Sequence, residues 1–349
     1  MQTVHTIIQR VAALVAVFNN LLLIFLIIFK SHRKVGKYKY LMIYISIFEI
    51  VYAIVDALAV PGIFTLDAMF VVVTFEDQVL VPDYMLASFG KLFCVFFGIS
   101  MAIFAVHFIY RYLVLSGHIL VKQYDAQTVI ILLIFPLFFG AFWFWVPLAM
   151  IAPYEAADQY ISDTFLKEIG KNISDVRYVG PYFWPIGSDC HPHIHWNAAI
   201  GILIMTIAII ISFGFIIVFG FKCYWETKEM IAKATHSTSF HKLQSQLFYA
   251  LVFQTVIPVI LMHIPASAGF TAAFFNSSIE FLGDLPSITI CLYPTLDPLP
   301  NFFIIKNYRD AITNCLRRLI GLKGATVDVG TTAMGSYAMT VPQTVSPTT

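Results

Sequence analysis

Residues 86–115 read LASFGKLFCVFFGISMAIFAVHFIYRYLVL, an apolar run that ends in an aromatic and basic foot at residues 107–112. At 1.5 Å per residue, about 20 helical residues cross a hydrocarbon core roughly 30 Å thick. With Arg111 at one membrane face, the other face falls near Lys91, and we expect both side chains to extend to water. The stretch therefore predicts a membrane-spanning helix.

The whole chain is too apolar for one soluble core. It has 349 residues, of which 59% are hydrophobic and 12% charged. Long apolar segments lie near residues 8–29, 41–64, 88–113, 128–151, 197–221, 247–271 and 285–305. We therefore expect an all-α membrane protein, a bundle of seven transmembrane helices.

Charges between these segments predict which ends face the cytoplasm. The first, third and fifth connections and the tail are basic, whereas the second, fourth and sixth connections are acidic. Basic connections stay in the cytoplasm, so the N-terminus is expected outside and the C-terminus inside. The glycosylation sequons at Asn172 and Asn276 both fall in connections assigned to the outside.

Two regions are expected at the C-terminal end. Apolar residues at helical spacing over 305–319, with basic residues around them, predict a juxtamembrane amphipathic helix. Cys315 in that helix is either palmitoylated or a reduced thiol. We expect residues 1–320 to form the seven-transmembrane domain and residues 321–349 a disordered cytoplasmic tail.

The cytoplasmic end of the third predicted helix carries Tyr110, Arg111 and Tyr112. Aromatic and basic side chains at a membrane face are ordinary anchors. The functional alternative is a latch, a guanidinium that exchanges partners between two bundle arrangements and meets a signalling protein. His107, one turn deeper, is interpreted as a buried histidine with satisfied hydrogen bonds rather than a ligand contact.

The second helix places Ser46, Glu49, Tyr52 and Asp56 on one stripe. A carboxylate in a membrane costs about 2.5–3.5 kcal/mol on insertion scales, so Glu49 and Asp56 must face the bundle. They form either a site for an agonist, an ion or protons, or a structural pair in which Asp56 meets Arg10. The ligand candidates within the membrane are Glu49, Asp56, His107 and His263.

Prolines cluster in the last two segments. Pro258 and Pro265 lie in the sixth, and Pro298 follows Asp297 in the seventh. Each proline removes a helical hydrogen bond and frees a carbonyl group. We expect kinked helices in which Asp297 and Asn301 satisfy the broken backbone and rearrange.

The remaining reactive residues give weak signals. Cys94 and Cys190 are candidates for a disulfide on the outer side, the alternative being two free thiols. His191, His193 and His195 do not have the spacing of a dedicated metal site. We expect no metal, no cofactor and no nucleic acid partner, and no catalytic string indicates an enzyme.

Several strings carry a family resemblance: HFIYRY at 107–112, KLQSQLFYALVFQTVIPVILMHIP at 242–265, and LYPTLDPLPNFFIIKNYRDAI at 292–312. They resemble the nematode serpentine chemoreceptors of the str class. The resemblance implies a G-protein-coupled receptor in the ciliary plasma membrane of chemosensory neurons that detects small volatile or soluble chemicals. Arg111 stands where rhodopsin-like receptors carry Asp-Arg-Tyr, but Tyr110 replaces the aspartate. Asp297 and Pro298 stand where those receptors carry Asn-Pro.

Three functions remain open from the sequence. The first is an odorant receptor that binds a small molecule from outside and activates a heterotrimeric G protein. The second is a subunit of a ligand-gated channel with seven spans. The third is a transporter that couples protons through Glu49 and Asp56.

Glycosylation mapping tests the predicted sidedness. We expect glycans at Asn172 and Asn276 in a cell that glycosylates secreted segments, and none on a sequon tag added to the tail. A glycosylated tag, with Asn172 and Asn276 unmodified, would reverse the topology.

Overall fold

The computed structural model describes residues 2–80, 82–232, 238–277 and 280–321. Six of its helices, counted within those ranges, are long and apolar enough to cross a membrane, and a bent pair at residues 285–319 brings the number to seven. The prediction of a seven-helix membrane bundle is confirmed. The spans are α1 Gln2–Lys30, α2 Tyr38–Ala59, α3 Asp83–Leu115, α4 Ile119–Met150, α6 Trp196–Ala232, α7 Thr238–Pro258 with α8 Ile264–Phe274, and α9 Glu280–Leu296 with α10 Leu299–Ile304.

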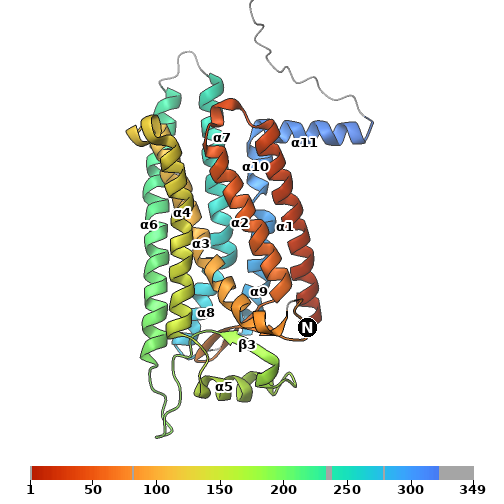
Figure 1. The fold of residues 1–349 in the computed structure, drawn as a ribbon, viewed down its shortest axis with the longest axis vertical. Coiled ribbons are helices and arrows are strands. Elements are labelled where there is room, and N and C mark those ends of the chain that lie inside the picture. Colours follow the sequence, from red (N-terminus) through yellow and green to blue (C-terminus); the bar gives the residue numbers. More distant parts are fainter. Residues whose placement is uncertain (1, 81, 233–237, 278–279, 322–349) are drawn as a thin grey trace, which may run out of the picture. The chain divides into compact units, whose positions relative to one another are not determined.

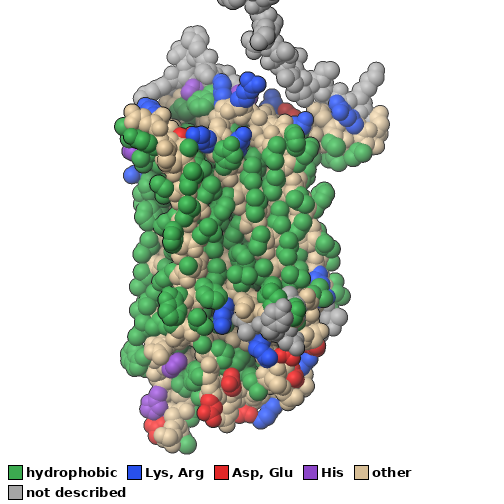
Figure 2. Space-filling view, in the orientation of Figure 1, with side chains coloured by type: hydrophobic (Ala, Val, Ile, Leu, Met, Phe, Trp, Pro, Cys, Tyr) green, Lys and Arg blue, Asp and Glu red, His purple; other side chains and the backbone are tan. Residues whose placement is uncertain are grey.

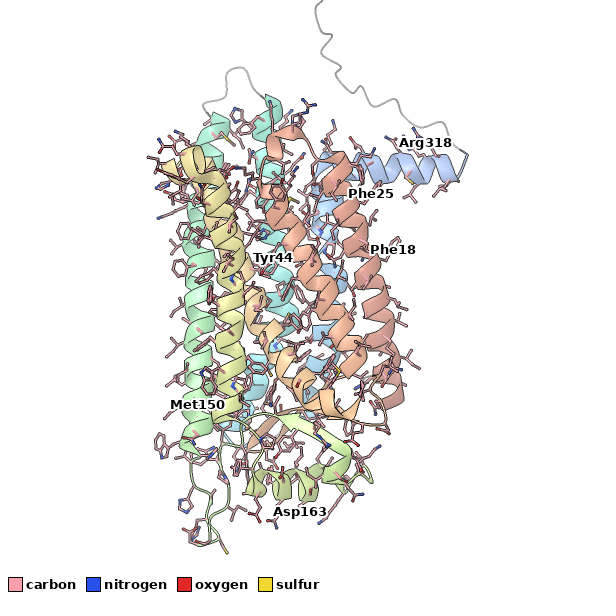
Figure 3. All side chains as sticks on the ribbon, viewed as in Figure 1. Phe18, Phe25, Tyr44, Met150, Asp163 and Arg318 are labelled. Atoms are coloured by element: carbon pink, nitrogen blue, oxygen red, sulfur yellow. The ribbon has the colours of Figure 1, made fainter. Side chains whose placement is uncertain are left out.

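Helix α3 lies at the centre of the bundle (Figure 1). Its most apolar window is 78% buried, against 28% for α4 and 17% for α6, so those two helices present most of their surface to lipid. On α1, the side chains of Phe18 and Phe25 also point away from the bundle (Figure 3). The helix that carries Arg111 is thus held on all sides by other spans.

A small antiparallel sheet covers the outer end of the bundle (Figure 1). Its strands are β1 Gly62–Leu66, β2 Met69–Phe75 and β3 Val176–Val179, with Phe64 opposite Val71 and Val73 opposite Tyr178. Every residue of β2 is buried, because helix α5, Glu155–Ile161, and its continuation cover the sheet from outside. The sheet was not predicted from the sequence. We call the two connections that form and cover it, at residues 60–80 and 152–195, the cap.

The cap is fastened to the first and last spans. The Ile63 N–H donates to Ser287 Oγ of α9 at 2.7 Å. Gln9 of α1 donates through Nε2 to the Pro61 carbonyl at 3.0 Å. The outer end of the bundle is therefore hydrogen-bonded to both α1 and α9.

Charges separate between the two ends of the bundle. Figure 2 shows an apolar band with mostly Lys and Arg at one end, and with Asp and Glu among further Lys and Arg at the other. The basic end carries the 3₁₀ turn Arg33–Val35, and the acidic end carries α5. The sequence's charge asymmetry is thus an asymmetry of the folded bundle, as the predicted topology requires.

The last described helix is α11, Lys306–Leu319, at the position of the predicted amphipathic helix. Its start is fixed to the end of α1, because the Tyr308 hydroxyl and Ser31 Oγ lie 2.5 Å apart and share a hydrogen bond. The predicted tail at 321–349 lies outside the described residues except for Gly321. The predicted domain boundary there remains a prediction.

Glycines allow α3 and α4 to pack closely. A Cβ atom built on Gly98 would lie 2.2 Å from Trp143 Cδ2, and one on Gly140 would lie 2.4 Å from Ile99 Cδ1. Real Cβ atoms do not approach so closely, so each glycine admits a side chain from the facing helix. The α3–α4 contact therefore depends on both glycines.

Replacing Gly98 with Ala tests this packing. We expect Gly98→Ala to destabilise the protein by about 1–3 kcal/mol, because the methyl group displaces the Trp143 indole. Gly214→Ala on α6 is the matched control, since its Cβ meets nothing within 4 Å. Thermal unfolding in detergent should show a lower Tm for Gly98→Ala alone. Equal Tm values for the two variants would contradict the close contact.

Candidate functional site

Arg111 is buried at the inner end of α3, with 1% of its surface exposed, so the expectation that its side chain extends to water was wrong. Its Nη1 donates to Gln244 Oε1 at 2.6 Å, and its Nη2 donates to the Gln244 backbone oxygen at 2.7 Å. Gln244 belongs to α7, so this two-point contact joins the third span to the sixth. The guanidinium also lies over the Tyr38 ring, 5.2 Å from its centroid.

A second set of contacts links the same region to α2 and α4. The Tyr110 hydroxyl donates to Asp125 Oδ1 at 2.9 Å, and Lys37 Nζ lies 3.3 Å from Asp125 Oδ2. The Tyr110 ring stacks on Tyr38 with centroids 6.0 Å apart. We call Lys37, Tyr38, Tyr110, Arg111, Asp125 and Gln244 the inner latch. It joins four spans at one level.

The neighbours of Arg111 have separate partners. The Tyr112 ring lies 5.2 Å from Lys222 Nζ on α6, an arrangement suited to an interfacial anchor. His107 is buried, and its Nδ1 shares a hydrogen bond with the Tyr38 hydroxyl at 3.3 Å. Its Nε2 has no hydrogen-bond partner among the described residues. The expectation that the hydrogen bonds of His107 are satisfied therefore holds for Nδ1 only.

Two carboxyl groups meet in the middle of the bundle. Glu49 of α2 lies against Asp297, which follows α9, and accepts a hydrogen bond from the Tyr293 hydroxyl at 3.4 Å. Asp297 is fully buried and accepts from Gln254 Nε2 of α7 at 2.8 Å. Two buried carboxyl groups side by side are costly unless a proton or a cation is shared between them. The pair therefore responds to any movement of α2, α7 or α9.

The break between α9 and α10 is satisfied by α1. Pro298 has no N–H to bond the Pro294 carbonyl four residues earlier. Asn20 Nδ2 donates to that carbonyl at 3.1 Å, and Asn19 Nδ2 donates to the Thr295 carbonyl at 2.9 Å. The sequence assigned this role to Asp297 and Asn301, which was wrong: Asp297 contacts Gln254 and Glu49 instead. Asn301 is buried at the start of α10.

The expected pair between Asp56 and Arg10 was also wrong. Arg10 Nη2 donates to the Gln78 carbonyl in the outer connection at 2.6 Å. Asp56 is buried near the outer end of α2, with 4% of its surface exposed. Arg10 therefore ties α1 to the cap.

The sixth span is interrupted after Pro258, as the proline pattern predicted. A π-helix occupies Val259–His263 between α7 and α8. His263 is buried there between the rings of Phe97 and Phe213, with centroids at 4.5 and 5.8 Å. A π-helix inside a span marks a place where the helical register can shift.

An apolar cavity of about 50 Å³ lies beneath the cap. Its walls come from β1 to β3 and from α3, α4, α6, α8 and α9; they include Phe70, Phe93, Phe97, Trp143, Phe270 and Ile290. We call it the apolar cavity. Its walls are apolar, but its volume is well below the roughly 300–1,000 Å³ of a typical ligand pocket, so a ligand would have to widen it.

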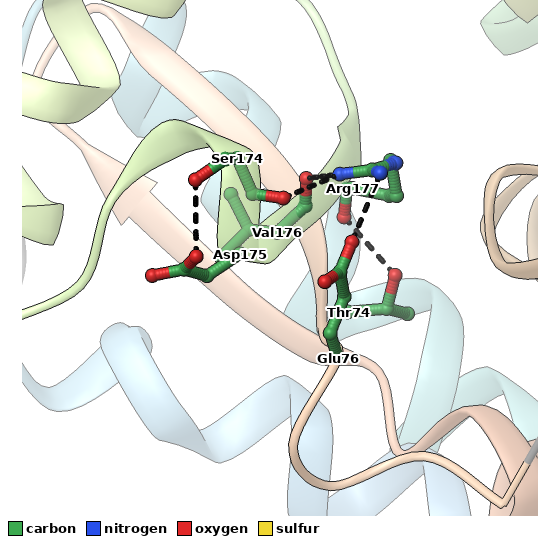
Figure 4. A network of polar contacts seen from close by, with 6 residues as sticks. All are labelled: Thr74, Glu76, Ser174, Asp175, Val176 and Arg177. Atoms are coloured by element: carbon green, nitrogen blue, oxygen red, sulfur yellow. Dashed lines mark hydrogen bonds and ion pairs between the residues drawn. The ribbon is translucent and has the colours of Figure 1, made fainter. Parts of the chain in front are cut away.

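The cap itself is held by polar contacts (Figure 4). Arg177 donates to the carbonyls of Ser174 and Val176, both at 2.8 Å, and pairs with Glu76 at 2.9 Å. The Tyr178 hydroxyl donates to Asp158 at 2.6 Å, and burial together with this carboxylate raises the pKa of Tyr178. These contacts join β2, β3 and α5.

Of the two alternatives for Cys94 and Cys190, the structure has two free thiols. Cys94 is inside α3 and lines the apolar cavity, whereas Cys190 is exposed in a turn with φ of 61°. Cys315 is free and exposed on α11, so both of its alternatives remain open.

The glycosylation candidates lie in outer connections. Asn172 precedes the 3₁₀ turn Ile173–Asp175, and Asn276 follows α8 with φ of 52°. No group of three or more metal-ligating residues is present in the part of the chain that the structure describes.

Several residues of these sites were not selected from the sequence, including Lys37 and Tyr38 of the inner latch. Gln244, Gln254 and Asn20 are polar side chains inside apolar segments, a signal that was available but unspecific. Asp125 is the single acid of the connection at residues 116–127, which also contains a single lysine. Their partners depend on tertiary packing.

Comparison with known proteins gives the family. The model of the "Serpentine type 7TM GPCR chemoreceptor Str" family matches residues 5–313. The G-protein coupled receptor str-217 of Caenorhabditis elegans is 34% identical over 306 residues, which cover 87% of each chain. Serpentine receptor class r-10 of the same nematode is 30% identical over 81% of this chain and 83% of its own.

The fold also matches a solved receptor. The crystal structure of squid rhodopsin superposes with a TM-score of 0.63 at 13% sequence identity, covering 94% of this chain and 89% of that one. At this identity the likeness shows the fold alone. Together with the family match it places the seven spans in a G-protein-coupled receptor architecture, in a plasma-membrane protein that is not an enzyme. The chain belongs to the Str family of serpentine seven-transmembrane chemoreceptors.

Proposed function

We propose that this chemoreceptor detects a small odorant or soluble chemical in the apolar cavity and opens the inner latch to a heterotrimeric G protein. We place it in the cilium of a sensory neuron. The channel and transporter hypotheses have no support, because the family is one of receptors. Glu49 and Asp297 then serve as a buried pair that the moving helices rearrange.

The contact between Arg111 and Gln244 carries this proposal. A guanidinium with 1% exposure and two short hydrogen bonds to a neighbouring span keeps the inner ends of α3 and α7 together. A G protein that inserts between these helices must break the contact or replace it. Arginine suits such an exchange because it stays charged and donates in several directions.

The helices that line the apolar cavity also carry the latch. Phe270 lies on α8, which continues through the π-helix into α7 and Gln244. Ile290 lies on α9, which leads to Asp297. A ligand between these helices therefore contacts the sixth and seventh spans, which are interrupted after Pro258 and at Pro298.

The energy required is modest. A ligand shifts the equilibrium only by its preference for the open arrangement, and a tenfold preference supplies about 1.4 kcal/mol. The apolar walls provide such a preference if they pack more closely around the ligand when the inner end of the bundle is open. We therefore expect the part of the agonist that lies in the apolar cavity to be small and weakly polar.

Arg111→Ala tests the latch in cells that express the receptor with a G protein and report calcium. We expect agonist-driven signalling, with an agonist found by screening volatile chemicals, to fall at least about tenfold, since no guanidinium remains to bind the G protein once α3 and α7 separate. Surface expression should be largely kept. Lys39→Ala, an exposed basic residue at the same end, is the control and should signal normally. Unchanged signalling in Arg111→Ala would remove Arg111 from the mechanism.

Pro258→Ala tests the interrupted sixth span. Alanine restores an N–H group and lets the α-helix continue past residue 258, so the bend costs more to rearrange. We expect the agonist concentration for half-maximal response to change severalfold, while the amount of mature glycosylated protein stays near wild type. A loss of mature protein that matches the loss of response would assign Pro258 a structural role.

A further inference from the structure

A second cavity lies on the outer side of the apolar cavity. Its volume is about 260 Å³, and its walls come from α3, β2, β3 and the connection at residues 153–173. We call it the outer cavity. Lys91, Asp158 and Arg177 are its charged lining residues.

Two of these three charges already have partners. Arg177 pairs with Glu76 and donates to two backbone carbonyls, and Asp158 accepts from the Tyr178 hydroxyl. Lys91 has no ion pair or hydrogen bond among the described residues. The other lysines of the outer connections differ, because Lys167 pairs with Asp163 and Lys171 pairs with Asp77.

An unpaired ammonium in a partly covered position requires an explanation. Lys91 is half-buried on α3, in a cavity covered by Pro153, Asp158 and β3. Asp158, the carboxylate that lines the same cavity, accepts a hydrogen bond from Tyr178 and forms no ion pair with Lys91. A negatively charged ligand group in the cavity would complete the site.

The two cavities share a wall. Val179 of β3 lines both of them. Lys91 lines the outer cavity, whereas Phe93 and Cys94 of the same helix line the apolar cavity about one turn deeper. A molecule with its charged group at Lys91 can thus extend an apolar tail toward the apolar cavity.

We propose that the outer cavity binds the carboxylate of a small monocarboxylic acid through Lys91, with a short hydrocarbon tail directed past Val179. This deepens the ligand-binding part of the proposed function. Asp158 disfavours a second negative charge, so a monoacid fits better than a diacid. Lys91 sets the specificity for a charged over a neutral ligand.

Binding to the purified full-length receptor tests this assignment without a G protein, so its failure leaves coupling through the latch untouched. The probes are hexanoate, hexan-1-ol and hexylamine, and the readout is the ligand-dependent Tm in neutral phosphatidylcholine nanodiscs at pH 7.4. We expect hexanoate to bind at least about tenfold more tightly than hexan-1-ol, because only the carboxylate pairs with Lys91. This comparison uses the wild-type chain alone. Equal binding, or tighter binding of hexylamine, would overturn the proposal.

Single substitutions test whether Lys91 supplies the positive charge that binds the carboxylate. We expect Lys91→Gln to weaken hexanoate binding at least about tenfold while leaving hexan-1-ol unchanged, and Lys91→Arg to keep most of the affinity. Lys167→Gln, which removes an outer lysine away from both cavities, should bind hexanoate like wild type. Unchanged binding in Lys91→Gln, or an equal loss in Lys167→Gln, would contradict the site.

A lipid phosphate is the other anion that a lysine near the membrane face meets. Nanodiscs that contain anionic phosphatidylglycerol separate the two sources. We expect the same hexanoate affinity in them, since the cavity is covered by the cap. Loss of hexanoate binding in anionic nanodiscs would assign Lys91 to the bilayer and overturn the proposal.

Discussion

A buried guanidinium needs hydrogen-bond acceptors, and at the inner end of α3 a single residue provides both of them. Gln244 offers its side-chain and backbone oxygens to Arg111, so the position of α7 is tied to that of α3. Leaving such a charge unpaired inside a protein is costly. The closed inner end is therefore stable until another acceptor reaches Arg111.

The same requirement for paired polar groups shapes the rest of the bundle. Prolines free backbone carbonyls in the seventh span, and two asparagines of the first span donate to them. Glu49 and Asp297 bring α2 against the same break. Because these contacts are few and specific, the last two spans have a limited set of arrangements, which is what a two-state receptor needs.

The sequence predicts the spans well because lipid imposes one simple rule. Backbone groups in the hydrocarbon must be bonded within the segment, so length and hydropathy identify α1 to α4, and loop charge gives the sidedness. The outer sheet was not predicted because MFVVVTF at residues 69–75 is a short apolar run, and hydropathy alone does not distinguish a buried strand from part of a membrane helix. Its pairing with Gly62–Leu66 on one side and with Val176–Val179, about a hundred residues later, on the other makes it a strand.

Site residues were predicted less well than spans. Arg111, Glu49 and Asp297 stood out because a charge inside an apolar segment is rare. Their partners did not, since Gln244, Gln254 and Asn20 are selected by the way helices pack. Arg10 shows the limit most clearly: its depth matched Asp56, but the cap brought the Gln78 carbonyl closer.

The separation of α3 from α7 is the quantity that the account predicts most directly. Spin labels at Ser116 and Lys242, introduced as cysteines after Cys190 and Cys315 are changed to serine, report the distance between their inner ends by pulsed electron resonance. We expect one short distance without partners and a second, longer one when agonist and G protein are added together. A single unchanged distance in the active complex would contradict the latch.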